Sequence, residues 1–221
     1  VDRLKDIFIS GGKNVAPAEM EAFINDDTKV IDLQGRTVMP GIIDPHTHYM
    51  QVAAPDESGM LAGQAEMLSL GITTSGAPSV RTDQLEAFQS LDARGELVQR
   101  VHVYLDYNGF CNEREQLEAF EAEQFTQDPD LRLAIAGVKM FGDGGACNAP
   151  AIAADYLDST PQNLKDRGFH NHGDLYIDAA EVTNLVTSVD AAGGITVIHA
   201  IGDLALSEAL QGLSDAYDTA P

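Results

Sequence analysis

The sequence predicts an α/β protein built from βαβ units around a parallel sheet. From Gly41 onward, short apolar runs alternate with stretches whose apolar residues recur at helical spacing. This alternation is typical of parallel sheets, because two parallel strands need a crossover connection between them. Three of the apolar runs also carry a histidine or a lysine near their carboxyl ends. Since 44% of the 221 residues are hydrophobic, the chain can bury a core of that kind.

The first forty residues have a different texture. DIFISG (6–11) and KVIDLQG (29–35) are short β-like runs that end at glycine. They alternate as strands do and are separated by APAEMEAFINDD, whereas the texture changes to strand and helix in turn from Gly41. We therefore expect residues 1–40 to form part of one domain and residues 41–221 to form the α/β domain.

Five strands and five helices are expected in the α/β domain. The strands are the apolar runs 41–48, 71–76, 101–107, 133–145 and 195–203. The helices are marked by apolar residues at helical spacing: Leu61, Ala65 and Leu68; Leu85, Phe88 and Leu91; the stretch 112–125; Val182, Leu185, Val186 and Val189; and Leu206, Ala209, Leu210 and Leu213. Asp178 caps the fourth helix with Glu181 three residues on, and that helix stops at Gly193-Gly194. The excursion at about 144–177 is too long for an ordinary connection, which indicates a functional loop.

Charge and composition exclude several classes of partner. The chain has 13 Lys and Arg against 35 Asp and Glu, a formal net charge of −22. Such an acidic surface repels phosphate backbones and anionic lipids, so we expect neither nucleic-acid nor membrane binding. Cys111 and Cys147 are too few for a disulfide framework, and no signal peptide or membrane span is visible. A reducing, cytoplasmic location is therefore expected, although Val1 in place of a starting Met leaves room for a missing upstream segment.

Polar residues at the strand ends are the candidates for metal binding and catalysis. Side chains alternate between the two faces of a strand, so three sets are each expected to share a face. These sets are Ile42, Asp44, His46 and His48; Lys139, Phe141 and Asp143; and Ile195, Val197, His199, Ile201 and Asp203. In a parallel barrel the carboxyl ends of the strands meet on one face, where active sites lie. We expect His46, His48, Lys139 and His199 to converge there.

These four residue types suit a metal site. Imidazole is the commonest zinc ligand, and two histidines spaced i, i+2 can approach one ion from the same side. A buried Lys139 pays a desolvation cost and has a lowered pKa, which exposes a nucleophilic amine. Such an amine can form a carbamate that bridges two metals, or a Schiff base with a carbonyl substrate. The neighbouring histidines favour the metal hypothesis, with a Schiff-base lyase as the weaker alternative.

The other histidines and the glycine-rich turn are given structural roles. His102 is expected to be a hydrogen-bonded core residue. His170 and His172 repeat the H-x-H spacing in a polar loop, where a solvated loop is favoured over a ligand or substrate contact. GDGG (142–145) lacks the spacing of a phosphate loop and is interpreted as a flexible turn that lets the backbone approach the site.

Three motifs in order, VMPGIIDPHTH, GVKMFGDGG and GGITVIHAIGDLAL, resemble the amidohydrolase superfamily, and within it the branch of N-substituted formamide deformylases (amidohydrolase family 3-like). The resemblance implies a TIM-like (β/α)8 metal-dependent hydrolase barrel, with residues 1–40 as part of a small β-sandwich. It also implies hydrolysis of an amide or formamide-type C–N bond in a small molecule by a metal-activated hydroxide. His46 and His48 would ligate the more buried metal, Lys139 would bridge as a carbamate, and His199 would ligate a second metal. Zinc is the expected metal, one or two ions, with manganese or iron as alternatives.

The sequence departs from the family pattern in two ways. The family expects a further histidine on strand six and a catalytic aspartate on strand eight, and both would lie beyond Pro221. A long insertion found in relatives after H-x-H is also absent. Since such a barrel needs about 250 residues, only about five βα units are expected here. The alternative hypothesis is therefore an inactive half-barrel fragment that needs its missing half. Its exposed edge argues for a homo-oligomer or a partner rather than a free monomer.

Overall fold

The computed structural model describes residues 8–10, 13–15, 33–52, 56–113, 125–145, 147–166 and 172–219. The chain divides into two compact units, residues 1–40 and 41–221. In the first unit, β1 (Phe8–Ser10) and β2 (Lys13–Val15) form an antiparallel hairpin. The expected strand at 6–11 is thus present as β1. The expected strand at 29–35 lies mostly outside the described residues, and Gln34 and Gly35 at its end form a turn.

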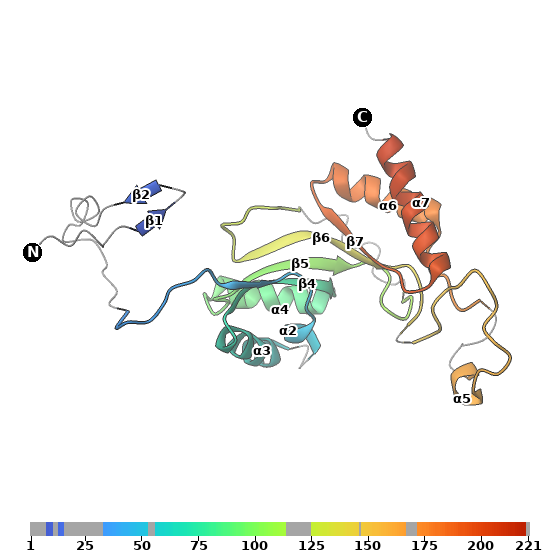
Figure 1. The fold of residues 1–221 in the computed structure, drawn as a ribbon, viewed down its shortest axis with the longest axis horizontal. Helices are drawn as coiled ribbons and strands as arrows, with labels where there is room; N and C mark the ends of the chain where they lie inside the picture. The colour runs from blue at the N-terminus through green and yellow to red at the C-terminus, as the bar shows by residue number, and fades with distance from the viewer. Residues whose placement is uncertain are drawn as a thin grey trace, which may run out of the picture. The chain divides into compact units, whose positions relative to one another are not determined.

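The second unit contains a five-stranded parallel sheet, which confirms the predicted fold class. Its strands are β3 (Ile42–Asp44), β4 (Ile72–Val80), β5 (Arg100–Asp106), β6 (Leu133–Phe141) and β7 (Ile195–His199). They lie side by side in chain order, and every neighbouring pair is parallel (Figure 1). A sheet in which each strand is added next to the previous one is the arrangement of a βα barrel. The five strands form a curled half-barrel.

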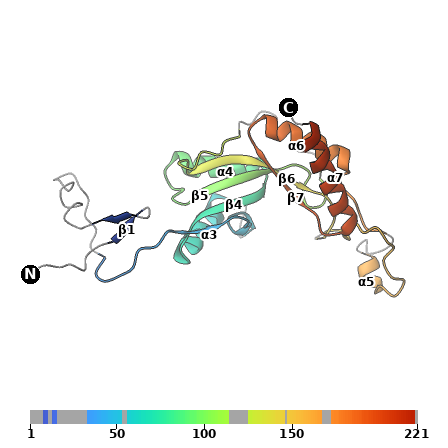
Figure 2. The ribbon, with the colours of Figure 1, turned by 45° about the horizontal axis from the view of Figure 1, so that its top comes forward.

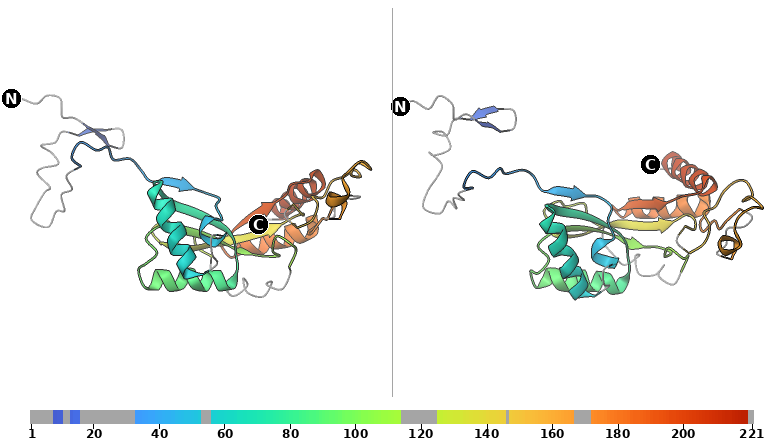
Figure 3. Two further views of the ribbon diagram at one scale, coloured as in Figure 1. Left: turned by 90° about the horizontal axis from the view of Figure 1, so that it is seen from below. Right: turned by 60° about the horizontal axis from the view of Figure 1, so that its bottom comes forward.

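Helices lie along the sheet in two groups, which Figures 2 and 3 show from different sides. The helices α2 (Tyr49–Val52), α3 (Glu57–Ser69) and α4 (Thr82–Ala93) lie near β4 and β5. Toward β7 the helices α6 (Ala179–Ala191) and α7 (Asp203–Thr219) pack against each other. A short helix, α5 (Gln162–Lys165), lies within the excursion. Most of the expected helix at 112–125 lies outside the described residues.

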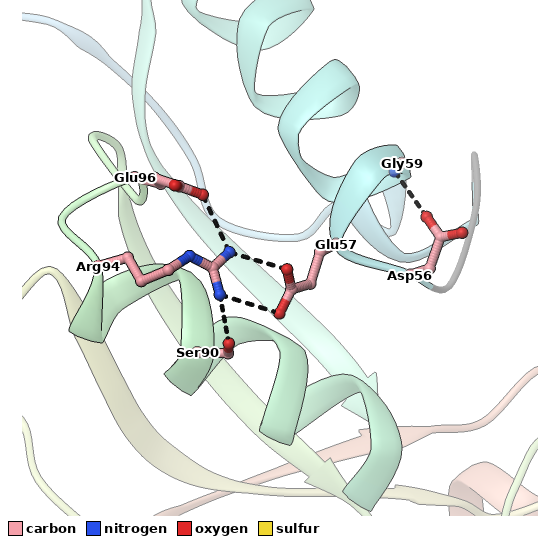
Figure 4. A network of polar contacts seen from close by, with 6 residues as sticks. All are labelled: Asp56, Glu57, Gly59, Ser90, Arg94 and Glu96. Atoms are coloured by element: carbon pink, nitrogen blue, oxygen red, sulfur yellow. Dashed lines mark hydrogen bonds and ion pairs between the residues drawn. The ribbon is translucent and has the colours of Figure 1, made fainter.

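Side-chain caps and one ion-pair network fix the helix ends. The Asp178 carboxylate accepts a hydrogen bond from the Glu181 N–H at 2.9 Å, as the capping pattern predicted. Asp56 caps α3 in the same way through the Gly59 N–H at 2.8 Å (Figure 4). Figure 4 also shows Arg94, just after α4, donating to both carboxylate oxygens of Glu57 and to Glu96. This exposed network joins the start of α3 to the end of α4.

Two apolar clusters lie between the sheet and the helices. The first joins β4 and β5 to α3 and α4; it contains Met60, Met67, Val80, Phe88, Leu91, Val101 and Val103. The second joins β6 to α6; it contains Val138, Met140, Val182, Leu185 and Val189. Because neighbouring residues of a strand point to opposite faces, the same strands present their other residues on the face away from the helices. We call this second face the inner face of the sheet.

The two cysteines meet although they are far apart in sequence. Cys111 follows β5 and Cys147 follows β6, and the structure joins them in a disulfide with Cα atoms 5.4 Å apart. Nothing in the sequence pattern predicted this pairing. The cysteines meet because β5 and β6 are neighbours and their following loops start at the same edge of the sheet. The result is a single cross-link beside the carboxyl ends of the strands.

In the described part of the chain, no helix is both long and apolar enough to cross a membrane.

Phe88 offers a test of the first cluster. Its side chain is fully buried, so Phe88→Ala should lower the free energy of unfolding by about 3–5 kcal/mol through lost apolar burial and a cavity. Urea denaturation followed by circular dichroism measures this change. Leu157→Ala is the matched control, since Leu157 is 76% exposed, and it should have little effect. Equal effects of the two substitutions would contradict the packing described here.

Candidate metal centre

The register of the strands brings Lys139 and His199 to the same end of the inner face. Lys139 on β6 is paired with Asp106 on β5, and Phe141 on β6 is paired with His199 on β7. Val138 and Met140 point toward α6, so the residues that alternate with them, Lys139 and Phe141, point away from the helices. Lys139 and His199 therefore lie at the same end of the inner face, and the convergence of all four predicted residues stays a prediction.

Lys139 is a buried amine held beside a buried carboxylate. Its side chain is only 3% exposed, and its Nζ lies 5.1 Å from the centre of the Phe141 ring. Burial lowers the pKa of Lys139 to about 8, and the negative charge of Asp106 opposes part of that decrease. A substantial fraction of this amine is therefore neutral in mildly alkaline solution. Such an amine can act as a nucleophile or as a ligand, which an ordinary surface lysine cannot do at that pH.

His199 also lies close to the Phe141 ring. The centres of the Phe141 and His199 rings are 5.2 Å apart. Burial lowers the pKa of His199, and the positive charges of Lys139 and, less strongly, His46 act in the same direction, while Asp143 opposes them. These influences show that His199 shares one electrostatic environment with Lys139, Asp143 and His46. A lowered pKa keeps the imidazole neutral, the form that binds metal ions.

The first H-x-H pair lies at the same end of the sheet, but it does not belong to a strand. Strand alternation had predicted that both histidines would share a strand face. β3 ends at Asp44, so His46 and His48 lie beyond the strand and both are exposed. Asp44 faces α3, in a depression shared with Glu66 and Met67, and was wrongly expected on the face of the site. The chain bends after Asp44 because the Asp44 carboxylate accepts from the His46 N–H at 3.3 Å. The rings of His46 and His48 are 5.5 Å apart and edge to face.

Gly76 on β4 determines where this bend passes. The Thr47 N–H donates to the Gly76 carbonyl at 2.9 Å. A Cβ atom at position 76 would collide with the carbonyl of Pro45, so only glycine allows the H-x-H segment to lie this close to β4. The His46 and His48 segment is therefore held at the end of the sheet by backbone contacts rather than by membership in a strand.

The donor set fits a divalent metal in its chemistry. The three imidazoles are nitrogen ligands of the kind that zinc prefers, and the buried amine of lowered pKa would become an anionic oxygen ligand only as a carbamate. As the side chains are placed, however, no three His, Cys, Asp or Glu residues in the described ranges are close enough together to hold an ion. The structure thus brings the ligand types to one end of the sheet without closing them around a common point.

Two carboxylates at the strand ends have roles that the sequence did not reveal. Asp106, at the end of β5, accepts hydrogen bonds from the Ser79 hydroxyl at 2.8 Å and from the Gly109 N–H at 2.7 Å, and lies beside Lys139. Asp143 was expected on the same strand face as Lys139, but β6 ends at Phe141, and the contacts of Asp143 were not foreseen. Its carboxylate is buried and accepts hydrogen bonds from the backbone. The position of Asp106 at the end of VHVYLD was the available signal, since it matches that of Lys139 on the next strand.

The remaining histidines lie outside the candidate site. His102 was expected to be a hydrogen-bonded core residue. It is instead half-buried and, with Tyr104, lines a hollow of about 340 Å³ on the inner face. His172 lies 3.2 Å from Asp155, and both side chains are mostly exposed. This agrees with a solvated loop. His170 lies outside the described residues.

Known proteins similar to this chain include dihydroorotases and a solved hydrolase. A dihydroorotase of Elusimicrobium minutum (strain Pei191) is 39% identical over 75 residues, which are 34% of this chain and 17% of that protein. A dihydroorotase of Syntrophus aciditrophicus (strain SB) is 29% identical over 108 residues, 47% of this chain and 25% of that protein. The structure of an uncharacterized metal-dependent hydrolase from Pyrococcus furiosus matches with a TM-score of 0.57 and 28% identity, covering 73% of this chain and 31% of that one. The chain thus spans a quarter or less of the two dihydroorotases.

The family match is broader than any of these pairwise similarities. The pattern described as the amidohydrolase family matches residues 49–220, which is most of the chain. Lys139 and His199 lie within the matched segment, and His46 and His48 lie directly before it. The parallel half-barrel and its clustered strand ends agree with this match. The chain belongs to the amidohydrolase family.

Proposed function

We propose that this chain contributes the metal-binding part of a metal-dependent hydrolase that breaks the C–N bond of an amide or formamide-type substrate. The observation that carries the proposal is the environment of Lys139. Its amine is buried at the carboxyl end of β6, has a pKa of about 8, and shares an electrostatic environment with His199. Ionisable groups with perturbed pKa values gather at functional sites more often than elsewhere.

The four nitrogen-bearing side chains have distinct roles in this proposal. His46 and His48 would hold a metal from the β3 side, and His199 would hold it or a second ion from the β7 side. Zinc is the proposed metal, one ion or two, with manganese or iron as alternatives. When bound, the metal would supply an acidified water and a polarised substrate carbonyl. Phe141, whose ring lies near both Lys139 and His199, would exclude bulk water from the space between them.

Lys139 has the chemistry needed to become an anionic ligand. A neutral amine can add to carbon dioxide to form a carbamate with release of one proton, and the low pKa makes the neutral amine available. The product would carry a negative charge near His199 and His46, where the metal's positive charge would compensate for it. We therefore propose carbamylation of Lys139 as the route by which a buried cation becomes a bridging ligand.

The substrate class is proposed from two sources. The sequence motifs resemble those of N-substituted formamide deformylases, whereas similar proteins from two bacteria are named dihydroorotases. Both possibilities involve a small molecule that contains an amide-type C–N bond. An N-substituted formamide and dihydroorotate are thus the first two substrates to assay.

A second proposal follows from the surfaces that the sheet leaves open. β3 and β7 are the edge strands, and α7 exposes an apolar stripe made of Leu206, Leu210, Leu213 and Tyr217. Exposed strand edges and apolar stripes are ordinarily covered by further structure. We propose that βα units continuing the sheet beyond β7 cover this stripe in the active hydrolase, and that the 221-residue chain by itself is inactive.

Metal content tests the first proposal. His46→Ala and His199→Ala should each weaken zinc binding by about tenfold or more, since losing groups that merely support a ligand already has an effect of that size. Elemental analysis after dialysis against zinc, together with competition against a chelator, measures the change. His172→Ala is the matched control, because His172 is exposed and lies in the excursion. Unchanged zinc content in both ligand variants would refute the proposed site.

The pH dependence of stability tests the state of Lys139. Its folded pKa of about 8 lies below the unfolded value of 10.5, so between these values the unfolded chain binds more protons. The free energy of unfolding of the metal-free protein should therefore rise with pH over this interval and be lowest, with respect to this group, below pH 8. Lys139→Met should remove this rise and stabilise the protein at pH 7 by at most about 3 kcal/mol.

Urea denaturation in the presence of a chelator, at several pH values, measures this effect. Lys165→Met is the control, since Lys165 lies on α5 and donates to the Asp158 carbonyl outside the site. Titration of other groups is common to all variants and cancels in the comparison. An equal pH dependence in the wild type and in Lys139→Met would show that the amine is not held in a buried, neutral-favouring environment.

Light scattering and an activity assay on the same sample test the second proposal. The isolated chain should self-associate or bind a dye that reports exposed apolar surface, and should show no turnover of either substrate. Leu210→Lys, which places a charge in the α7 stripe, should reduce the self-association. Turnover by a monodisperse monomer of 23.6 kDa would contradict this proposal.

A further inference from the structure

Asp143 is a buried carboxylate that joins three segments of the chain. It follows β6, and its side chain is essentially inaccessible to solvent. Its Oδ2 accepts hydrogen bonds from the N–H groups of Gly202 at 2.7 Å and Ala151 at 3.0 Å, and its Oδ1 accepts from the Ile201 N–H at 3.0 Å. The three donors come from the excursion and from the turn between β7 and α7.

The charge of this group is stabilised by backbone dipoles. Burying a carboxylate is costly unless it is hydrogen-bonded, and hydrogen bonds from N–H groups to an ionised oxygen are among the strong ones. Two of the donors, Ile201 and Gly202, directly precede the first residue of the 17-residue helix α7. The amino-terminal end of a helix favours a negative charge. The position of Asp143 therefore stabilises both its own charge and the start of α7.

The backbone segments around Asp143 are in close contact with one another. The Gly142 N–H donates to the His199 carbonyl at 2.7 Å, and the Leu204 N–H donates to the Ala151 carbonyl at 3.2 Å. A Cβ atom at position 202 would collide with the carbonyl of Ala151, so glycine is required there. The chain on both sides of His199 is thus tied to the end of β6 and to the excursion.

The His199 ring lies beside this carboxylate without forming a short hydrogen bond to it. The distance from His199 Nε2 to Asp143 Oδ1 is 3.9 Å, which is longer than a hydrogen bond. Besides the direct effect of its charge on the pKa of His199, Asp143 acts on His199 through the backbone that follows it. Its oxygens already accept three N–H hydrogen bonds and its side chain is inaccessible to solvent, so it is less suited to bind a metal than a surface carboxylate.

We propose that Asp143 is a positioning residue that fixes His199 in the orientation needed for metal binding. This inference rests on the proposed function, since His199 is proposed there as a ligand. It goes beyond it by assigning the orientation of that ligand to a carboxylate that itself binds no metal. It also explains why the excursion lies against the site: Ala151 supplies one of the three hydrogen bonds that hold the carboxylate.

A second carboxylate provides a matched control. Asp203, the first residue of α7, accepts a hydrogen bond from the Ala153 N–H at 2.9 Å. It joins the same excursion to the same helix, but no interaction with His199 is seen for it in the described residues. Asp203→Asn should therefore loosen this junction without changing the orientation of His199.

The test compares Asp143→Asn with Asp203→Asn in the full chain, using three readouts. In the metal-free protein, nitrogen-15 NMR of the His199 ring should show one conformation in the wild type and in Asp203→Asn, and averaging in Asp143→Asn. In the zinc-loaded protein, chelator competition should show at least about a tenfold loss of affinity in Asp143→Asn only. A cobalt-loaded sample should show a changed visible spectrum for the same variant. A His199 ring that is unchanged in Asp143→Asn would overturn the proposal.

The proposed metal site and the proposed role of Asp143 fail in different ways. If the wild type binds no zinc, the proposed function fails, while the metal-free NMR comparison still decides the role of Asp143. If Asp143→Asn does not fold, hydrogen exchange in the wild type decides. The Ile201 and Gly202 amides lie outside β7, and the proposal requires them to exchange as slowly as the amides within it. Fast exchange at these two amides would overturn it.

Discussion

Hydrogen bonding between the parallel strands β5, β6 and β7 is the constraint on which the candidate site depends. The register places Asp106 opposite Lys139 and Phe141 opposite His199. A slip of one residue would turn each of these side chains toward the helices, because strand residues alternate between faces. The same slip would expose Val138 and Met140, which are fully buried against α6. The apolar packing on the outer face thus enforces the arrangement of the polar groups on the inner face.

Two buried charged residues lie on β6 and directly after it, and the fold stabilises them by different means. Lys139 has a carboxylate neighbour, and its pKa has fallen toward neutrality. Asp143 is surrounded by three backbone N–H donors at the start of a helix. A buried charge without such partners lowers the free energy of unfolding by roughly several kcal/mol. The function proposed for Lys139 explains why a charged residue is buried there. At Asp143 the explanation is structural, because its carboxylate joins three segments of the chain.

The outer helices show how the half-barrel ends. On α7 the small residues Ala205, Ala209 and Ala216 are buried and allow close contact with α6, whereas the apolar stripe of Leu206, Leu210, Leu213 and Tyr217 is exposed. A helix with apolar residues on two sides is typical of one that packs between two neighbours. The hollow on the inner face, lined by His102 and Tyr104, lies where opposing strands would stand in a closed barrel. Both surfaces are thus consequences of a barrel sheet that is open at β3 and β7.

The sequence by itself determined the order of strands and helices, the parallel sheet, and the common face of Lys139 and His199. These features follow from local periodicity, which each segment carries in its own residues. The alternation failed at His46 and His48 because β3 ends at Asp44, and the bend over Gly76 depends on a strand some thirty residues away. The pairing of Cys111 with Cys147, the place of Asp106 beside Lys139, and the three hydrogen bonds to Asp143 were decided only by the tertiary structure. Each of them depends on which distant segments become neighbours, and local periodicity does not specify that.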